Sequence, residues 1–406
     1  MLLSFFAGMY ILFFFVPLDT FPRIVTQVPL YSFLGLSVLK TLLRQLPLKI
    51  TAYMVWYFVL FLMGVFSSLY AASTKHVFSA LYLLFVTWLV TFAFAQYVQT
   101  KTDFQRIFSF FSYFPLFLVF YLLIYGISFD SEGRFGRELF GNANIIATFL
   151  MLSLCCVVWL LFYGNRKILP FNLMMFLVLL YITALTGGRK YILVPVVFFL
   201  LIMIFKNWET NRGGIVLYLL LFFVLLIAGV WSVLSIPTLY NTIGVRFEGL
   251  FDFFRGGPEE ADASTLIRYM MIENGWKWFQ FKPILGHGLN NFAYLFSNVL
   301  DDVYAHNNFI EMMVNLGLVG LILYYVFYVY LIIKLFKIGN ERTGIRNFFL
   351  AYLLILLFFE LGAVTYQHTQ IHIMLALASA FLWLYEHGKF APVGTQIGSL
   401  TNSTAG

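Results

Sequence analysis

Four stretches of an otherwise apolar sequence combine glycines with arginine, lysine, histidine or asparagine. They are residues 133–144, with Arg134, Arg137 and Asn144; 186–190, with Arg189 and Lys190; 268–289, with Arg268, Gly286 and Gly288; and 306–320, with His306, Asn307 and Glu311. Arginine binds phosphate oxygens through two N–H groups and stays charged. A neutral histidine can accept a proton from an attacking hydroxyl. Together these residue types predict a diphosphate site beside a general base.

Each stretch also has a structural explanation when it is taken singly. Arginines at helix ends pair with carboxylates or extend toward the lipid headgroups, and glycines turn the chain or let two helices approach closely. The catalytic interpretation is favoured because Arg189, Arg268 and His306 come from distant stretches. The predicted topology nevertheless places all three on one side of the membrane.

His306 lies next to a predicted helix start. Asn308 and Glu311 have the spacing of a capping box. We therefore predict that Asn308 caps this helix and that Glu311 reaches back to it, a role that we prefer to catalysis. The positive end of a helix attracts anions and disfavours imidazolium, so His306 should stay neutral and able to accept a proton.

The composition indicates which elements hold these residues. Of 406 residues, 62% are hydrophobic and 11% are charged, against about 45–50% apolar and about 25% charged residues in soluble domains. Cytosolic enzymes, disordered chains and disulfide scaffolds are thereby excluded, and a polytopic membrane protein remains. Cys155 and Cys156 are adjacent in one apolar run and are predicted to be buried thiols.

Twelve apolar runs predict an all-α integral membrane protein with about twelve transmembrane helices, since one crossing needs ~20 apolar residues. The runs fall at residues 2–17, 24–39, 51–70, 77–98, 107–127, 144–163, 168–186, 190–206, 215–236, 308–334, 346–366 and 371–386. We expect nine helices in residues 1–236, a large extracytoplasmic loop in 237–307, three helices in 308–388 and a disordered cytoplasmic tail in 389–406.

Basic residues predict the orientation of this bundle. Most Lys and Arg residues of the short loops lie on the same side as the N-terminus, which the positive-inside rule places in the cytoplasm. Both termini are then cytoplasmic, and the long loop and the four stretches lie outside. We attribute the net charge of +7 to this topology and not to nucleic-acid binding.

The long loop contains one apolar segment, residues 264–281, that is rich in Met, Trp and Phe. We predict an amphipathic helix there, because such side chains would be costly to leave in water. Packed on the outer helix ends or on the lipid surface, it would form a roof that carries Arg268 to the site.

Several of these motifs resemble those of the bacterial O-antigen ligase and polymerase superfamily. The signature of this superfamily resembles the pattern at 306–320, which is His306-Asn307, then nine residues, then Gly317-x-x-Gly320. Thr186–Lys190, the Pro-x-x-Gly-x-Gly stretch at 283–288 and Gly-Asn-x-Asn at 141–144 resemble further elements of the family. The resemblance covers roughly residues 133–335. It departs from the family at Gly188, where many members have Ser, and at Leu323, where the ligase motif has a small residue or Tyr.

The resemblance implies a membrane-embedded, glycosyltransferase class C-like fold and a donor glycan carried on undecaprenyl diphosphate. His306 would be the catalytic base. The donor diphosphate would be held by Arg189, Arg268, Arg134, Arg137 and Lys190, and the supporting residues would be Asn307, Asn144, Glu311, Gly286 and Gly288. The implied location is the bacterial cytoplasmic (inner) membrane, with the active site on the periplasmic face. Membrane lipid and the lipid-linked donor and acceptor are the implied partners, with a chain-length regulator and a flippase as further candidates.

Three functions remain open at this point. The leading hypothesis is an O-antigen or capsular polysaccharide polymerase that transfers the growing glycan to the next lipid-linked repeat unit. The second is an O-antigen ligase that transfers the finished glycan to lipid A-core. The third is a polysaccharide flippase or transporter, which is disfavoured because the sequence has no obvious inverted repeat and its polar residues gather at the outer face.

The sequence predicts no metal and no other cofactor. A diphosphate leaving group needs neutralisation of charge, which arginines can supply. The nearest approach to an Asp-x-Asp metal motif is Glu260-x-Asp262, which lies in a Gly/Pro-rich loop. His368 and His372 are spaced four residues apart, but the sequence offers no third ligand.

Overall fold

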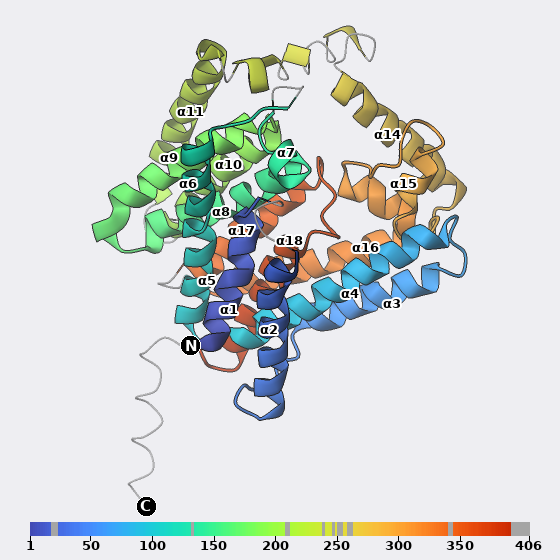
Figure 1. Ribbon diagram of the computed structural model, residues 1–406, viewed down its shortest axis with the longest axis horizontal. Helices are drawn as coiled ribbons and strands as arrows, with labels where there is room; N and C mark the ends of the chain where they lie inside the picture. The colour runs from blue at the N-terminus through green and yellow to red at the C-terminus, as the bar shows by residue number, and fades with distance from the viewer. Residues whose placement is uncertain are drawn as a thin grey trace, which may run out of the picture.

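The computed structural model describes residues 1–17, 23–130, 134–207, 212–237, 240–245, 248–249, 255–257, 263–339 and 344–390. This part of the chain is helical (Figure 1), with one isolated bridge between Phe129 and Phe135. The helices are α1 (Leu2–Leu12), α2 (Arg23–Leu42), α3 (Ala52–Ser67), α4 (Thr74–Tyr97), α5 (Lys101–Tyr113), α6 (Pro115–Tyr125), α7 (Arg137–Phe140), α8 (Ala143–Tyr163), α9 (Leu169–Leu185), α10 (Arg189–Asn207), α11 (Arg212–Ser235), α14 (Ala263–Phe281), α15 (Asn291–Phe296), α16 (Asn308–Lys337), α17 (Ile345–Phe359) and α18 (Thr369–Glu386). The acidic residues Glu260 and Asp262, and the predicted disordered tail from residue 391 on, lie outside the described residues.

Six helical segments of the described chain are long and apolar enough to cross a membrane. They are Thr74–Tyr97, Lys101–Tyr125, Ala143–Tyr163, Arg166–Leu185, Arg189–Asn207 and Asn308–Lys337. Each predicted apolar run falls on a helix or a pair of helices, but several of these helices are shorter than a full crossing. The all-helical, membrane-type architecture is therefore confirmed, whereas twelve crossings remain a prediction.

Helices α8, α17 and α18 form the centre of the bundle. Most residues of each are buried, including the free thiols of Cys155 and Cys156 in α8. A helix that is apolar on all sides is stable only when other helices surround it. Helix α8 packs on α5, α9 and α10, α17 packs on α10 and α16, and α18 packs on α3, α4 and α16.

Loops that the sequence assigns to opposite sides of the membrane gather at opposite ends of the bundle. At one end, the ammonium of Lys49 donates to carbonyls at the end of α4, and Lys101 lies 5.4 Å from the ring centroid of Phe390. At the other end, the backbone N–H of Ala72 donates to His287 O at 3.0 Å. Alternate crossing of a membrane produces such a separation.

The predicted apolar helix of the long loop corresponds to α14. It packs with α15 against the outer part of α16 (Figure 1). Their shared apolar cluster contains Met271, Phe292, Phe296, Ala305, Ile310 and Val314. Gly275 permits close contact between α14 and α16, since a Cβ at this position would lie 2.4 Å from Ile310 Cγ2. Through this packing α14 holds Arg268 beside the segment that leads into α16.

Candidate active site

Helix α16 is broken at Gly317, the first glycine of the motif that follows His306. Gly317 has φ 64° and ψ −162°, which only glycine adopts readily. A Cβ at this position would lie 2.2 Å from Ile284 O. The break divides α16 into a short outer part, 308–316, and a long inner part, 318–337.

Residues 283–288 bond to the backbone groups that this break frees. The bonds run from His287 N to Val314 O (2.8 Å), from Gly288 N to Asn315 O (2.8 Å), from Leu318 N to Pro283 O (2.8 Å) and from Val319 N to Ile284 O (3.3 Å). Unpaired backbone groups are costly in an apolar environment. The Pro-x-x-Gly-x-Gly stretch is thus a structural insert in the break of α16.

Gly286 and Gly288 serve this insertion. Both have positive φ, +69° and +102°. A Cβ on Gly286 would lie 2.6 Å from the backbone of Asn315, and one on Gly288 would lie 2.5 Å from Ala71 Cβ. The supporting role expected for these glycines is therefore backbone packing, at a distance from the cavity.

The backbone around His306 is held from both sides. His306 itself has φ 52°, a conformation that is rare outside glycine and that clusters at functional sites. On its N-terminal side, Ala305 N donates to Glu311 Oε2 at 2.8 Å, while Glu311 Oε1 accepts from Asn315 Nδ2 at 2.9 Å. Glu311 thus positions the loop that carries the imidazole.

The predicted cap of this helix is wrong by one residue. Asn307 is the N-cap, and its Oδ1 accepts from the N–H groups of Phe309 and Ile310 at 3.0 and 3.1 Å. Asn307 has the extended conformation that an N-cap requires, whereas Asn308 is already helical. The side chain of Asn308 instead accepts from Thr365 N at 3.0 Å.

Arg134 joins two of the four stretches. Its Nε donates to Thr186 O at 3.3 Å and its Nη2 donates to Asn144 Oδ1 at 3.4 Å. Phe135 N adds a bond to Leu185 O at 2.8 Å. The Gly-Asn-x-Asn element and the turn before α10 therefore form one unit, in which Asn144 orients a guanidinium.

Lys190 reaches across to the loop that follows α17. Its ammonium donates to Gly362 O and lies 5.0 and 4.8 Å from the ring centroids of Tyr191 and Phe359. Aromatic faces attract cations. Helix α17 ends at Phe359, whereas the predicted apolar run extends seven residues further, to 366. The residues after Phe359 turn into the site, where Asn308 N donates to Glu360 O at 2.9 Å.

A cavity of about 320 Å³ lies where these segments meet. Its lining residues are Leu83, Asn142, Asn144, Ile145, Thr148, Phe149, Lys190, Tyr191, Tyr304, His306, Ala363, Val364, Gln367, His368, Thr369 and Gln370. The volume is at the lower end of the ~300–1,000 Å³ that ligand sites occupy. Segments 142–149, 190–191, 304–306 and 363–370 therefore share one cavity, whose lining combines apolar and hydrogen-bonding side chains.

Three cations act on the imidazole of His306. Burial, followed by the charges of Arg268, Lys190 and Arg134, lowers the pKa of His306 to about 3. The cations come from α14, from the start of α10 and from the loop before α7. Such a convergence of positive charge suits a multiply charged anion and keeps the imidazole neutral until that anion is bound.

Of the five predicted diphosphate ligands, Lys190 lines the cavity, and Arg134 and Arg268 act on His306 through their charge. Arg189 begins α10 and Arg137 is exposed on α7, and neither is among the residues that line the cavity. Among the described residues, no group of three or more His, Cys, Asp or Glu side chains could hold a metal. His368 lines the cavity, whereas His372 is buried with its Nε2 3.0 Å from Tyr366 O.

Sequence reasoning missed several residues of the cavity. Tyr304 packs on His306 with ring centroids 4.4 Å apart, and Gln367 and Gln370 line the wall beside His368. The sequence gave a weak signal, since four polar residues at 367–370 interrupt the apolar sequence between the predicted runs 346–366 and 371–386.

Two comparisons with known proteins bear on this site. The O-antigen ligase family model matches residues 174–325. No curated protein matches the chain at a significant level. The matched segment contains Lys190, Arg268 and His306, and also the broken part of α16 with its insert. The family match and the geometry therefore point to the same region.

Proposed function

The O-antigen ligase domain at residues 174–325 makes the chain a member of the O-antigen ligase and polymerase superfamily, and we propose that it is a membrane-embedded glycosyltransferase with a polyprenyl-diphosphate-linked donor. The observation that carries this proposal is the convergence of Arg134, Lys190 and Arg268 on His306. A diphosphate leaving group needs such cations, and an acceptor hydroxyl needs such a base.

The proposed reaction needs no other group. The donor diphosphate lies against the three cations, and the acceptor hydroxyl gives its proton to the neutral imidazole of His306. The acceptor oxygen forms a bond to the anomeric carbon as the bond from that carbon to the phosphate oxygen breaks. Polyprenyl diphosphate leaves as an anion, and His306 releases its proton to water.

We propose the polymerase reaction, with the next lipid-linked repeat unit as the acceptor. The departure at Leu323 from the ligase motif supports this choice. Ligation to lipid A-core is the second candidate, which the description of the matching family favours. Twelve crossings, cytoplasmic termini and a site on the outer face of the bacterial inner membrane belong to the same proposal.

Deletion of the gene distinguishes these candidates in cells that make lipopolysaccharide. Loss of a polymerase leaves single repeat units on the lipid A-core, whereas loss of a ligase leaves bare core and accumulates lipid-linked polymer. Polyacrylamide gels of the lipopolysaccharide report both outcomes. Unchanged polysaccharide in the deletion strain would refute both forms of the proposal.

A further inference from the structure

The cavity wall at the start of α18 has a different chemistry from the region around His306. It is formed by Gln367, His368 and Gln370, all of which are uncharged at neutral pH. Burial, together with the charge of Lys190, lowers the pKa of His368 to about 4. This wall therefore offers hydrogen bonds without charge.

Each of these three side chains is held at one end. Gln367 Nε2 donates to Asn290 Oδ1 at 3.1 Å and to Tyr366 Oη at 2.7 Å. Gln370 Nε2 lies 3.1 Å from His368 Nδ1. Within the described ranges of the chain, Gln367 Oε1, His368 Nε2 and Gln370 Oε1 form no hydrogen bond, so three polar atoms are available to a ligand.

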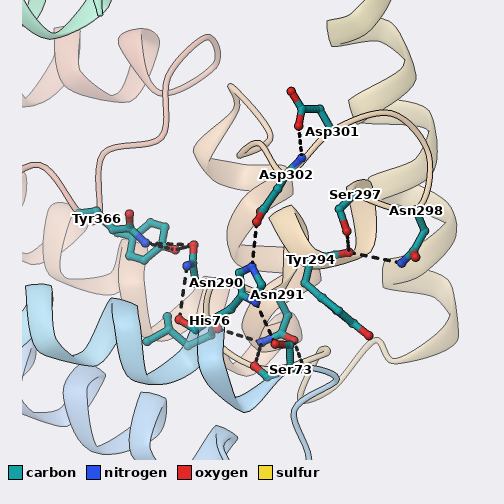
Figure 2. Close-up of polar contacts among 12 residues, drawn as sticks. Ser73, His76, Asn290, Asn291, Tyr294, Ser297, Asn298, Asp301, Asp302 and Tyr366 are labelled. Carbon is teal, nitrogen blue, oxygen red and sulfur yellow. Dashed lines mark hydrogen bonds and ion pairs between the residues drawn. The ribbon is translucent and has the colours of Figure 1, made fainter. Parts of the chain in front are cut away.

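A network outside the cavity fixes this wall. Figure 2 shows Asn290 between Tyr366 and the start of α4, where its Nδ2 donates to His76 O at 3.4 Å. Helix α18 is tied to α4 by the hydroxyls of Thr369 and Thr87, 2.7 Å apart. Preorganised groups lose little freedom when they bind a ligand. The wall thus has the rigidity that a specific binding site needs.

The chemistry of the wall suits a sugar better than a phosphate. Amide oxygens accept hydrogen bonds but repel anions, and an imidazole nitrogen can donate or accept. The same cavity presents the rings of Phe149 and Tyr191 and the amides of Asn142 and Asn144. Apolar surface with a few placed hydrogen-bonding groups is typical of sites for neutral polar ligands.

We propose that Gln367, His368 and Gln370 form a subsite that binds the hydroxyl groups of a sugar residue next to His306. This inference rests on the proposed glycosyl transfer. The sugar could belong to the acceptor or be the first residue of the donor, and both present the same hydroxyls. We assign it to the acceptor, because the hydroxyl that attacks must lie at the imidazole that shares this cavity.

The test uses full-length protein in detergent and the cell's own substrates. Lipid-linked oligosaccharide extracted from a strain that carries His306→Ala serves as donor. Its oligosaccharide, released from the lipid diphosphate by mild acid, serves as acceptor. KM is measured for each substrate in turn, and binding of the released oligosaccharide is measured separately by the rise in Tm that it causes.

We expect Gln367→Ala and Gln370→Ala to raise KM for the acceptor by about 2- to 10-fold, the value of one neutral hydrogen bond, with KM for the donor unchanged. The rise in Tm caused by the oligosaccharide should shrink in the same variants. A higher KM for the donor alone would overturn the assignment to the acceptor. Unchanged KM for both substrates, with an unchanged Tm response, would overturn the subsite.

Two controls keep these outcomes separate. Gln99→Ala makes the same substitution beyond the opposite end of α4 and should alter neither KM nor the Tm response. Wild-type protein that transfers nothing would refute the proposed function itself. Active wild-type protein with fully active variants would refute only the subsite.

Discussion

The two sides of the cavity are built on different physical principles. Around His306, cations from three separate elements act through charge, which falls off slowly with distance. At Gln367 and Gln370, amides act through hydrogen bonds that need about 2.7–3.2 Å. The comparison suggests that the first side binds an anionic leaving group and the second orients a neutral sugar. Substitutions on the two sides should therefore differ in size and in sensitivity to salt.

The largest effect is expected for His306→Ala. Loss of a general base costs about 10²- to 10⁴-fold in rate, so chain extension should be abolished on gels of the polysaccharide while the protein remains in the membrane. The matched control is His76→Ala, which removes an imidazole that lies 3.3 Å from Asp302 and outside the cavity lining. Polymer of near-normal length from His306→Ala would refute the assignment of the base.

The next effect separates Arg268, whose charge acts on His306, from Arg189, which is not among the three charges that lower the pKa of His306. Arg268→Lys should lower the transfer rate about tenfold, because lysine keeps the charge but loses the bidentate contact. Sequence reasoning places Arg189 in the same role, whereas the structure predicts that Arg189→Lys has a smaller effect. Initial rates at saturating acceptor measure both, and equal losses would remove the distinction.

The pH dependence of stability tests the cationic side independently of activity. The pKa of His306 is about 3 in the folded protein, below the ~6.5 of an unfolded histidine. Between about pH 6.5 and about pH 3 this histidine is protonated in the unfolded state but not in the folded state. Protonation therefore stabilises the unfolded state, and the free energy of unfolding decreases as pH falls below ~6.5. The Tm of His306→Gln should therefore decrease less than the Tm of the wild-type protein when the pH is lowered from 7.5 to 5.

The same Tm measurements are repeated in the presence of inorganic diphosphate. If it binds Arg134, Lys190 and Arg268, it neutralises their charge and raises the pKa of His306. The difference in Tm loss between wild type and His306→Gln should then shrink. An identical pH response of the two proteins, with and without diphosphate, would contradict the charge arrangement.

The smallest effect is expected from removal of divalent cations. Excess chelator should leave the transfer rate within about twofold of its untreated value, because arginine and lysine neutralise the leaving group. The amide side contains His368, the one cavity histidine besides His306. Activity that is lost with chelator and restored by a divalent ion would assign His368 a metal-binding role.

Much of the fold follows from the sequence, because apolar periodicity and length determine which segments become helices. The placement of Arg268 and His306 on one side follows from the sequence, because both lie in the one long loop predicted at 237–307. The cap at Asn307 was missed because two asparagines are adjacent, and only the backbone conformation of the first distinguishes them. The role of Gly286 and Gly288 could not be predicted, since it depends on a break in a helix that begins twenty residues later.

The polar wall at Gln367 and Gln370 was also missed. A glutamine before an apolar run has the same local signal whether it faces water, lipid headgroups or a cavity. Its position depends on the end of α17 at Phe359 and on contacts with Asn290, which is 77 residues away in sequence. Long-range contacts of this kind leave no periodic trace in the sequence.

The break in α16 has a consequence for biosynthesis. The last carbonyls of the outer part of α16, those of Val314 and Asn315, accept hydrogen bonds from residues 287 and 288. The next residue, Leu289, donates from its N–H to Ser67 Oγ at 3.0 Å. The cavity closes only when residues 363–370 arrive, near the end of translation. N-terminal segments fold first during synthesis, so the nascent chain should pass most of its time on the ribosome without a formed catalytic cavity. A ribosome stalled before residue 363 should therefore carry an inserted helical bundle that cannot react with lipid-linked sugars.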